Sequence, residues 1–241
     1  MSEKDFWKSH QKILVILAHP DDPEFFCGAT IAKWTKNHHD VIYCLLTKGE
    51  KGINKSFADQ RDIVEIRKRE QRDAASELGV SQIFYLDNED GYLYSNISLR
   101  KEIVKIIRQI KPDVIVTCDP TNFYIQDYYI NHPDHRTTGQ VVLDAIFPAA
   151  QNPLFFPELL NENLDPHEIK EVWITLAKEP NLRIDVTEFW HKKISALLYH
   201  KSQIGNEKKF IKRMMEKHTD DSDRNFPRYE ESFVRIVFRT Q

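Results

Sequence analysis

The feature that most constrains the fold is a regular alternation of short apolar runs with longer amphipathic stretches. Four apolar runs predict buried strands, at residues 12–18, 40–47, 82–86 and 113–118. Between them, helical patterns cover residues 24–36, 59–78 and 98–110. This alternation favours a parallel sheet, because parallel neighbours need a crossover connection that is usually a helix. We therefore expect an α/β fold with a Rossmann-like, mostly parallel sheet flanked by helices.

The second half of the chain continues this pattern less regularly. A helix is predicted over residues 133–150, and an Asn- and Pro-rich loop over residues 151–167. Beyond the loop we expect a strand at 171–177, a helix at 189–203 and a last strand at 232–238. No repeat, low-complexity tract or linker divides the chain. We expect one domain over residues 1–241, with a small C-terminal extension.

Glycine spacing and charge exclude several common functions. The seven glycines form no G-x-G-x-x-G, Walker A or G-x-S-x-G pattern, which excludes a dinucleotide loop, a P-loop and a nucleophile elbow. The formal net charge of −3 argues against a nucleic-acid partner. The apolar runs are far shorter than the roughly 20 residues of a membrane span. Three separated cysteines and an N-terminus without an apolar signal core indicate a cytoplasmic protein.

A histidine and two carboxylates directly follow the first predicted strand, in the sequence A-H-P-D-D. Open parallel sheets bind ligands outside the carboxyl ends of their strands. His19 and Asp22 are three residues apart and can converge on one metal ion, which leaves Asp21 free to act as a base on a metal-bound water. The alternative is a proline-rich turn in which Asp21 or Asp22 caps the next helix.

A similar cluster follows the fourth predicted strand, in the sequence H-P-D-H. His132 and His135 can face the same site from the first turn of a helix. Taken alone, this cluster is also explained as a capped helix start, because Asp134 suits the positive end of a helix. Two such clusters on two strand–helix loops favour a mononuclear metal site. The spacing does not decide which of His132 and His135 binds the metal.

The pairing of A-H-P-D-D with H-P-D-H resembles the LmbE or PIG-L family of metal-dependent deacetylases. This family includes deacetylases of N-acetylglucosaminyl-phosphatidylinositol, of the mycothiol and bacillithiol precursors, and of chitobiose. The resemblance covers nearly the whole chain, and its weaker pieces include G-A-T-I-A at 28–32, Arg67-x-x-Glu70, Asp90-Gly91-x-Leu93, Lys193, His200-x-Ser202-Gln203 and Glu231. One departure is Pro23, which stands where many members carry an acidic residue; here Glu24 follows it.

The resemblance implies a role for each residue of the two clusters. It implies that His19, Asp22 and His135 are the metal ligands and that Asp21 is the general base. His132, held by Asp134, would face the developing oxyanion or act as an acid.

The resemblance also implies that Arg67 and Asp90 contact substrate hydroxyls. The residues alone leave open a salt bridge between Arg67 and Glu70 along their helix. They also leave His200 as either a pocket residue or a buried structural histidine. The aromatic residues Phe123, Tyr124, Tyr128 and Tyr129, which precede His132, suit either a sugar-binding lid or a packed surface loop.

The two clusters predict a metal site with a base beside it, and the resemblance implies a zinc-dependent hydrolase that removes an N-acetyl group from an N-acetylglucosamine-containing amino sugar or a similar small N-acyl substrate. Ferrous iron is a second candidate metal. Two histidines and a carboxylate also describe the facial triad of Fe(II) oxygenases, and a non-catalytic metal- or sugar-binding protein is a third class. The additional base-like Asp21 favours the hydrolase, because oxygen activation does not require it. The apolar pattern does not fix the oligomeric state, and a homo-oligomer is compatible with it.

Overall fold

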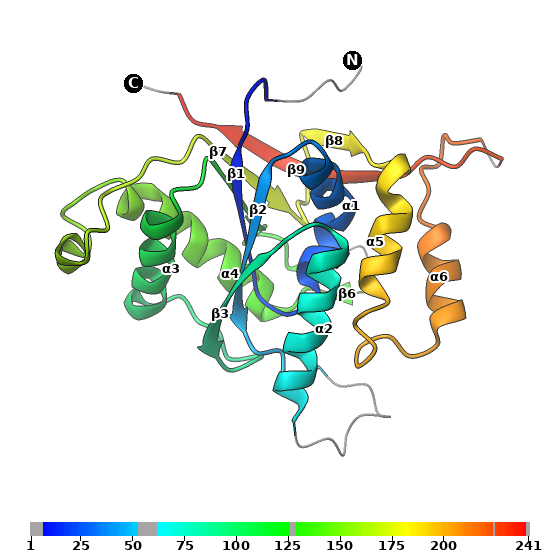
Figure 1. Ribbon diagram of the computed structural model, residues 1–241, viewed down its shortest axis with the longest axis horizontal. Coiled ribbons are helices and arrows are strands. Elements are labelled where there is room, and N and C mark those ends of the chain that lie inside the picture. Colours follow the sequence, from blue (N-terminus) through cyan, green and yellow to red (C-terminus); the bar gives the residue numbers. More distant parts are fainter. Residues whose placement is uncertain (1–6, 53–61, 126–128, 224, 240–241) are drawn as a thin grey trace.

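The computed structural model describes residues 7–52, 62–125, 129–223 and 225–239. Within these residues, a seven-stranded sheet has the order β3-β2-β1-β4-β7-β9-β8 (Figure 1). The strands are β1 (Lys12–Leu17), β2 (Asp40–Thr47), β3 (Gln82–Asn88), β4 (Val114–Cys118), β7 (Glu171–Thr175), β8 (Leu182–Asp185) and β9 (Glu230–Val237). The first five in sheet order run parallel, and β9 is antiparallel to both of its neighbours. The expected mostly parallel α/β sheet is confirmed.

Helices cover both faces of this sheet (Figure 1). One face carries α1 (Asp22–Lys36), α2 (Ile63–Glu77) and α5 (Trp190–Leu197), with α6 (Glu207–Met215) beside them, and the other carries α3 (Ile97–Ile110) and α4 (Pro133–Asp144). Strand β1 contributes Ile13, Val15 and Leu17 to the first core and Leu14 and Ile16 to the second. A strand buried on both faces has a continuous apolar sequence, which is the pattern of β1.

Several elements differ from the sequence prediction. The helix predicted over 133–150 is α-helical only to Asp144 and continues as a π-helical segment, Ala145–Ala150. Pro148 lies in this segment and has no N–H to continue an α-helix. The loop predicted over 151–167 contains a 3-10 helix at Pro157–Glu162. Residues 59–61 of the helix predicted at 59–78 lie outside the described residues.

The sequence did not predict the shortest strands. These are β8 and the two-stranded hairpin of β5 (Tyr124–Ile125) and β6 (Tyr129–Ile130). Strands of two to four residues are too short for a periodic signal. In the described part of the chain, none of the helices has the length and apolar character needed to cross a membrane.

The order of the strands reverses between β1 and β4. From β1 the chain adds β2 and then β3 on one side, and it returns through α3 to place β4 on the other side of β1. This reversal is the position at which open α/β sheets bind ligands, outside the carboxyl ends of the strands. The two predicted His/Asp clusters follow β1 and β4, so the topology brings both to this position.

Helix α1 is interrupted near its middle, and a buried ion pair compensates for the interruption. Cys27 has a non-helical backbone, with φ −146° and ψ 22°. The carboxylate of Glu231 accepts the N–H groups of Ala29 and Thr30, at 3.2 and 2.7 Å. The ammonium of Lys193 donates to the carbonyl of Phe25 at 2.8 Å and to Glu231 at 2.6 Å. These polar residues therefore satisfy backbone groups that the interrupted helix leaves without partners.

Helix α4 approaches the end of β4 very closely at Gly139. A Cβ atom at this position would lie 2.9 Å from the backbone nitrogen of Pro120 and would overlap the carbonyl oxygen of Cys118. Backbone atoms cannot move aside as a flexible side chain can, so only glycine permits this approach. Because α4 begins at Pro133, the same contact fixes the position of His135 in its first turn.

We expect Gly139→Ala to lower the free energy of unfolding by about 1–3 kcal/mol, because the added methyl group forces α4 away from β4. The matched control is Gly28→Ala in α1, where the nearest atom to the new Cβ is the flexible Lys193 Cγ, 3.4 Å away. Urea denaturation of both variants measures the difference. An equal effect of the two substitutions would contradict the close-approach explanation.

Candidate metal and catalytic site

Three of the predicted residues meet at the carboxyl ends of β1 and β4. Nδ1 of His19 lies 3.2 Å from Oδ2 of Asp22, and Nε2 of His135 lies 3.2 Å from Oδ1 of Asp22. One ligand atom from each residue lies within 4.8 Å of the others. Two imidazoles and a carboxylate are donors that zinc and iron accept. The three side chains therefore fit a metal ion in both number and type of donor.

The charge of Asp22 suits this use. Burial alone would raise its pKa, but the adjacent His135 and His19 hold the pKa of this carboxyl well below its usual range. A backbone hydrogen bond also holds the carboxylate in place, because the N–H of His19 donates to Oδ2 of Asp22 at 2.8 Å. Asp22 is therefore an ionised carboxylate at the start of α1, with one oxygen facing each histidine.

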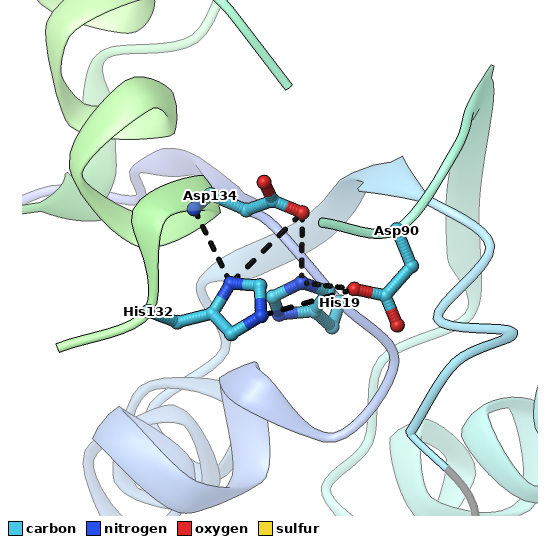
Figure 2. Close-up of side chains that lie close together, drawn as sticks. All are labelled: His19, Asp90, His132 and Asp134. Carbon is cyan, nitrogen blue, oxygen red and sulfur yellow. Dashed lines mark hydrogen bonds and ion pairs between the residues drawn. The ribbon is translucent and has the colours of Figure 1, made fainter. Parts of the chain in front are cut away.

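A second group surrounds the other side of His19, as Figure 2 shows. This group consists of His19, Asp90, His132 and Asp134. One nitrogen or carboxylate oxygen from each of these four residues lies within 4.8 Å of the other three. Nε2 of His19 lies 3.2 Å from Oδ2 of Asp134 and 3.3 Å from Oδ1 of Asp90. His19 thus has Asp22 at one ring nitrogen and two further carboxylates at the other.

Asp134 is fully buried, and the loop after β3 holds its carboxylate. Oδ2 accepts the N–H of Gly91 at 2.7 Å, and Oδ1 accepts the N–H of Leu93 at 3.2 Å. These bonds aim Oδ2 at Nε2 of His19. A carboxylate on the second ring nitrogen fixes the tautomer and orientation of a metal-binding histidine. Asp134 can therefore keep Nδ1 of His19 free to face Asp22 and His135.

The contacts of His132 differ from the expectation that Asp134 holds this ring. Oδ2 of Asp134 is 4.0 Å from Nδ1 of His132 but 3.2 Å from His19. Nδ1 of His132 instead accepts the backbone N–H of Asp134 at 3.2 Å, so His132 is the N-cap of α4. Burial and the neighbouring His19 lower the pKa of His132. A neutral ring with Nδ1 as acceptor carries its proton on Nε2.

Asp21 has a backbone conformation that is unusual for a residue with a Cβ. Its φ of 97° and ψ of −27° lie in the left-handed region, where strain on the order of 1–3 kcal/mol is typical of functional sites. Two residues of α2 hold it there. The N–H of Asp21 donates to Oε1 of Gln71 at 2.7 Å, and Oδ2 of Asp21 lies 3.1 Å from Nη2 of Arg67. Burial raises the pKa of Asp21 against the charge of Arg67, which makes the carboxylate a stronger base.

The two residues expected to contact substrate have different surroundings. Arg67 is buried, and its guanidinium donates to the carbonyls of Pro20 and Gly49 as well as pairing with Asp21. Glu70, the other partner considered for Arg67, accepts two hydrogen bonds from Ser202 instead, at 2.8 and 2.6 Å.

Asp90 lies directly in the second group around His19. Burial would raise its pKa, but the hydrogen bond and charge of His19 lower it to about 2. Its Oδ2 accepts the backbone N–H of Lys51 at 3.2 Å, so the loop after β2 fixes this carboxylate.

Polar residues that did not stand out in the sequence complete the site. Oδ1 of Asn131 lies 2.9 Å from Nδ1 of His135, which directs Nε2 of that ring toward Asp22. Gln71 contacts Asp21, as described above. Asn131 directly precedes the H-P-D-H motif, and this adjacency is the only sequence signal for it. Gln71 directly follows the Arg67-x-x-Glu70 piece, and this adjacency is its sequence signal.

The aromatic residues that precede His132 lie at the surface. Phe123, Tyr124 and Tyr129 are exposed, and the two tyrosines belong to the β5–β6 hairpin. The guanidinium of Arg136 stacks on Phe123, 4.5 Å from the ring centre. Tyr128 lies outside the described residues.

Comparisons with known proteins show which proteins this chain is similar to. A family model described as PIG-L, GlcNAc-PI de-N-acetylase, matches residues 14–146. The diacetylchitobiose deacetylase of Thermococcus kodakarensis is 35% identical over 193 residues, which cover 80% of this chain and 70% of that protein. A probable N-acetyl-α-D-glucosaminyl L-malate deacetylase 2 of Bacillus anthracis is 28% identical and covers 87% and 88% of the two chains. The solved structure of an N,N'-diacetylchitobiose deacetylase from Pyrococcus horikoshii has a TM-score of 0.84 at 28% identity, covering 95% of this chain and 85% of the other.

We expect Asp134→Asn to weaken zinc binding by about 10- to 100-fold, because an amide cannot accept both backbone N–H groups and still face Nε2 of His19. Competition with a chromophoric chelator measures the affinity. The matched control is Asp87→Asn, which changes an exposed carboxylate on β3. Unchanged zinc affinity in a folded Asp134→Asn variant would show that Asp134 does not orient the histidine.

Proposed function

The chain belongs to the PIG-L family of GlcNAc-PI de-N-acetylases, and on this premise we propose that it is a zinc-dependent hydrolase that removes the N-acetyl group from small N-acetylglucosamine-containing molecules. Relatives named as deacetylases of diacetylchitobiose and of N-acetylglucosaminyl malate support this substrate class. The observation that carries the proposal is the convergence of His19, Asp22 and His135, with Asp21 directly before Asp22 in the chain. The addition of β7 and β9 to the same sheet supports one domain over the whole chain.

In this proposal His19, Asp22 and His135 hold the metal. When bound at such a site, zinc lowers the pKa of water and polarises the amide carbonyl. Ferrous iron is the second candidate, because the same donors suit it. Asp134 and Asn131 direct the two rings, so that Nδ1 of His19 and Nε2 of His135 both face Asp22.

Asp21 is the general base. Amide hydrolysis moves a proton from water to the departing amine, and a carboxylate next to ligand Asp22 can accept this proton and then donate it to the amine nitrogen. Arg67 holds the carboxylate, and its contacts with Pro20 and Gly49 favour this role over a direct contact with substrate.

His132 is the group that stabilises the oxyanion. Its Nδ1 accepts a backbone hydrogen bond, so its Nε2–H is available as a donor to the carbonyl oxygen as negative charge develops there. One donor of this kind contributes about 2.7–4 kcal/mol to transition-state stabilisation. Nε2 of His132 also lies 4.0 Å from Oδ1 of Asp90. We assign Asp90 the role of binding the hydroxyl groups of the sugar.

The role of Asp21 predicts a loss of activity without loss of metal. We expect Asp21→Asn to lower kcat/KM for acetate release from diacetylchitobiose and N-acetylglucosamine by at least about 100-fold. Metal analysis should give the same zinc content as the unchanged protein. Asp87→Asn is the control and should retain full activity. Deacetylation at the unchanged rate by Asp21→Asn would exclude Asp21 as the base.

Removal of the metal provides an independent test. We expect dialysis against a strong chelator to abolish acetate release and stoichiometric zinc to restore it, because the amide carbonyl is otherwise not polarised. Ferrous iron added without oxygen identifies the better of the two metals. Full activity of protein that is free of metal by elemental analysis would contradict the proposed chemistry.

A further inference from the structure

The buried contacts around Asp21 assign a function to a residue outside both His/Asp clusters. We propose that Gln71 is a positioning residue for Asp21, and that Glu24 and His200 fix the orientation of Gln71. The inference rests on the proposed role of Asp21 as the base.

Gln71 is fully buried and uses both ends of its amide. Oε1 accepts the N–H of Asp21 at 2.7 Å, and Nε2 donates to the two carboxylate oxygens of Glu24, at 3.0 and 3.1 Å. Glu24 is also fully buried, and its Oε2 lies 3.2 Å from Nε2 of His200, which is buried as well. A continuous row of hydrogen bonds thus joins the segment after α5, helix α1 and helix α2 to the backbone of Asp21.

The direction of each bond in this row follows from Glu24. A carboxylate oxygen without a proton only accepts hydrogen bonds, and both oxygens of Glu24 accept from the amide nitrogen of Gln71. The amide oxygen of Gln71 must then face the N–H of Asp21. For the same reason Nε2 of His200 donates to Glu24. A glutamine alone could turn its amide around, but a glutamine held by Glu24 presents an acceptor to Asp21.

This row of hydrogen bonds ends at Asp21, whose backbone is in the left-handed region. Asp21 has a φ of 97°, and in this conformation its N–H donates to Oε1 of Gln71. Arg67 and Gln71 are four residues apart and lie on the same face of α2. Arg67 holds the carboxylate of Asp21, and Gln71 holds its backbone. Loss of the Gln71 contact would let the Asp21 backbone relax and would move the base relative to ligand Asp22.

The contact between Ser202 and Glu70 offers a comparison, because it links the same two segments without reaching Asp21. Ser202 is buried and donates from its N–H and hydroxyl to Glu70, the residue before Gln71 on α2. This contact also ties α2 to the segment after α5. It does not touch Asp21, so Ser202→Ala removes a buried hydrogen bond from the same helix without changing the base.

The first test compares Gln71→Met with Ser202→Ala in the zinc-loaded full chain. We expect Gln71→Met to lower kcat for deacetylation by about 10- to 100-fold, the cost of a misplaced catalytic group, with KM and zinc content unchanged. The backbone amide of Asp21 should exchange its proton with solvent faster in this variant, as measured by NMR. Ser202→Ala should change neither kcat nor the exchange of this amide. Unchanged kcat and unchanged amide exchange in Gln71→Met would overturn the proposal.

The second test is an exchange of side chains, which keeps the volume of the site. Gln71→Glu alone places two carboxylates against each other, so it should lower kcat and speed up the exchange of the Asp21 amide. Combining it with Glu24→Gln places an amide donor at position 24 against a carboxylate acceptor at position 71. We expect the double variant to recover most of the lost kcat. A double variant as impaired as Gln71→Glu would overturn the proposal. If the unchanged protein releases no acetate, the proposed function fails, and the amide exchange of Asp21 still decides whether Gln71 positions it.

Discussion

Three buried carboxylates surround His19, and the other groups of the site compensate the cost of burying their negative charge. Asp22, Asp90 and Asp134 all lie within 3.3 Å of a ring nitrogen of His19. Buried charges are costly unless each is paired and hydrogen-bonded. Backbone N–H groups from the loops after β1, β2 and β3 donate to these carboxylates, and His135 shares Asp22. A cation at the His19–Asp22–His135 group would complete this compensation.

The topology explains why so many loops can contribute. The loops after β1, β2, β3 and β4 all leave the same edge of the sheet, because these strands run parallel. The loops after β1 and β4 supply the metal-binding candidates. The loops after β2 and β3 supply Asp90 and the backbone groups that hold the carboxylates. Helix α2 adds Arg67 and Gln71, so the position of the base depends on an element distant in sequence from both clusters.

Much of the fold and the composition of the site could be predicted from sequence, because the signals are local. The continuous apolar run of β1 shows a strand buried on both faces, and the two His-Pro-Asp motifs lie in the connections that follow β1 and β4. The partners of each side chain could not be predicted in the same way. Asp134 is next to His135 in sequence, yet its carboxylate faces His19, because the loop carrying Gly91 and Leu93 turns it there. The link from His200 through Glu24 likewise joins residues 176 positions apart.

The central claim is that the metal lies between Nδ1 of His19, Asp22 and Nε2 of His135, while Asp134 stays at the other nitrogen of His19. Anomalous diffraction at the zinc absorption edge, from crystals of the zinc-loaded protein, tests this most directly. We expect one strong peak bounded by those three side chains. A peak among Asp90, His132 and Asp134 instead, or no bound zinc, would contradict it.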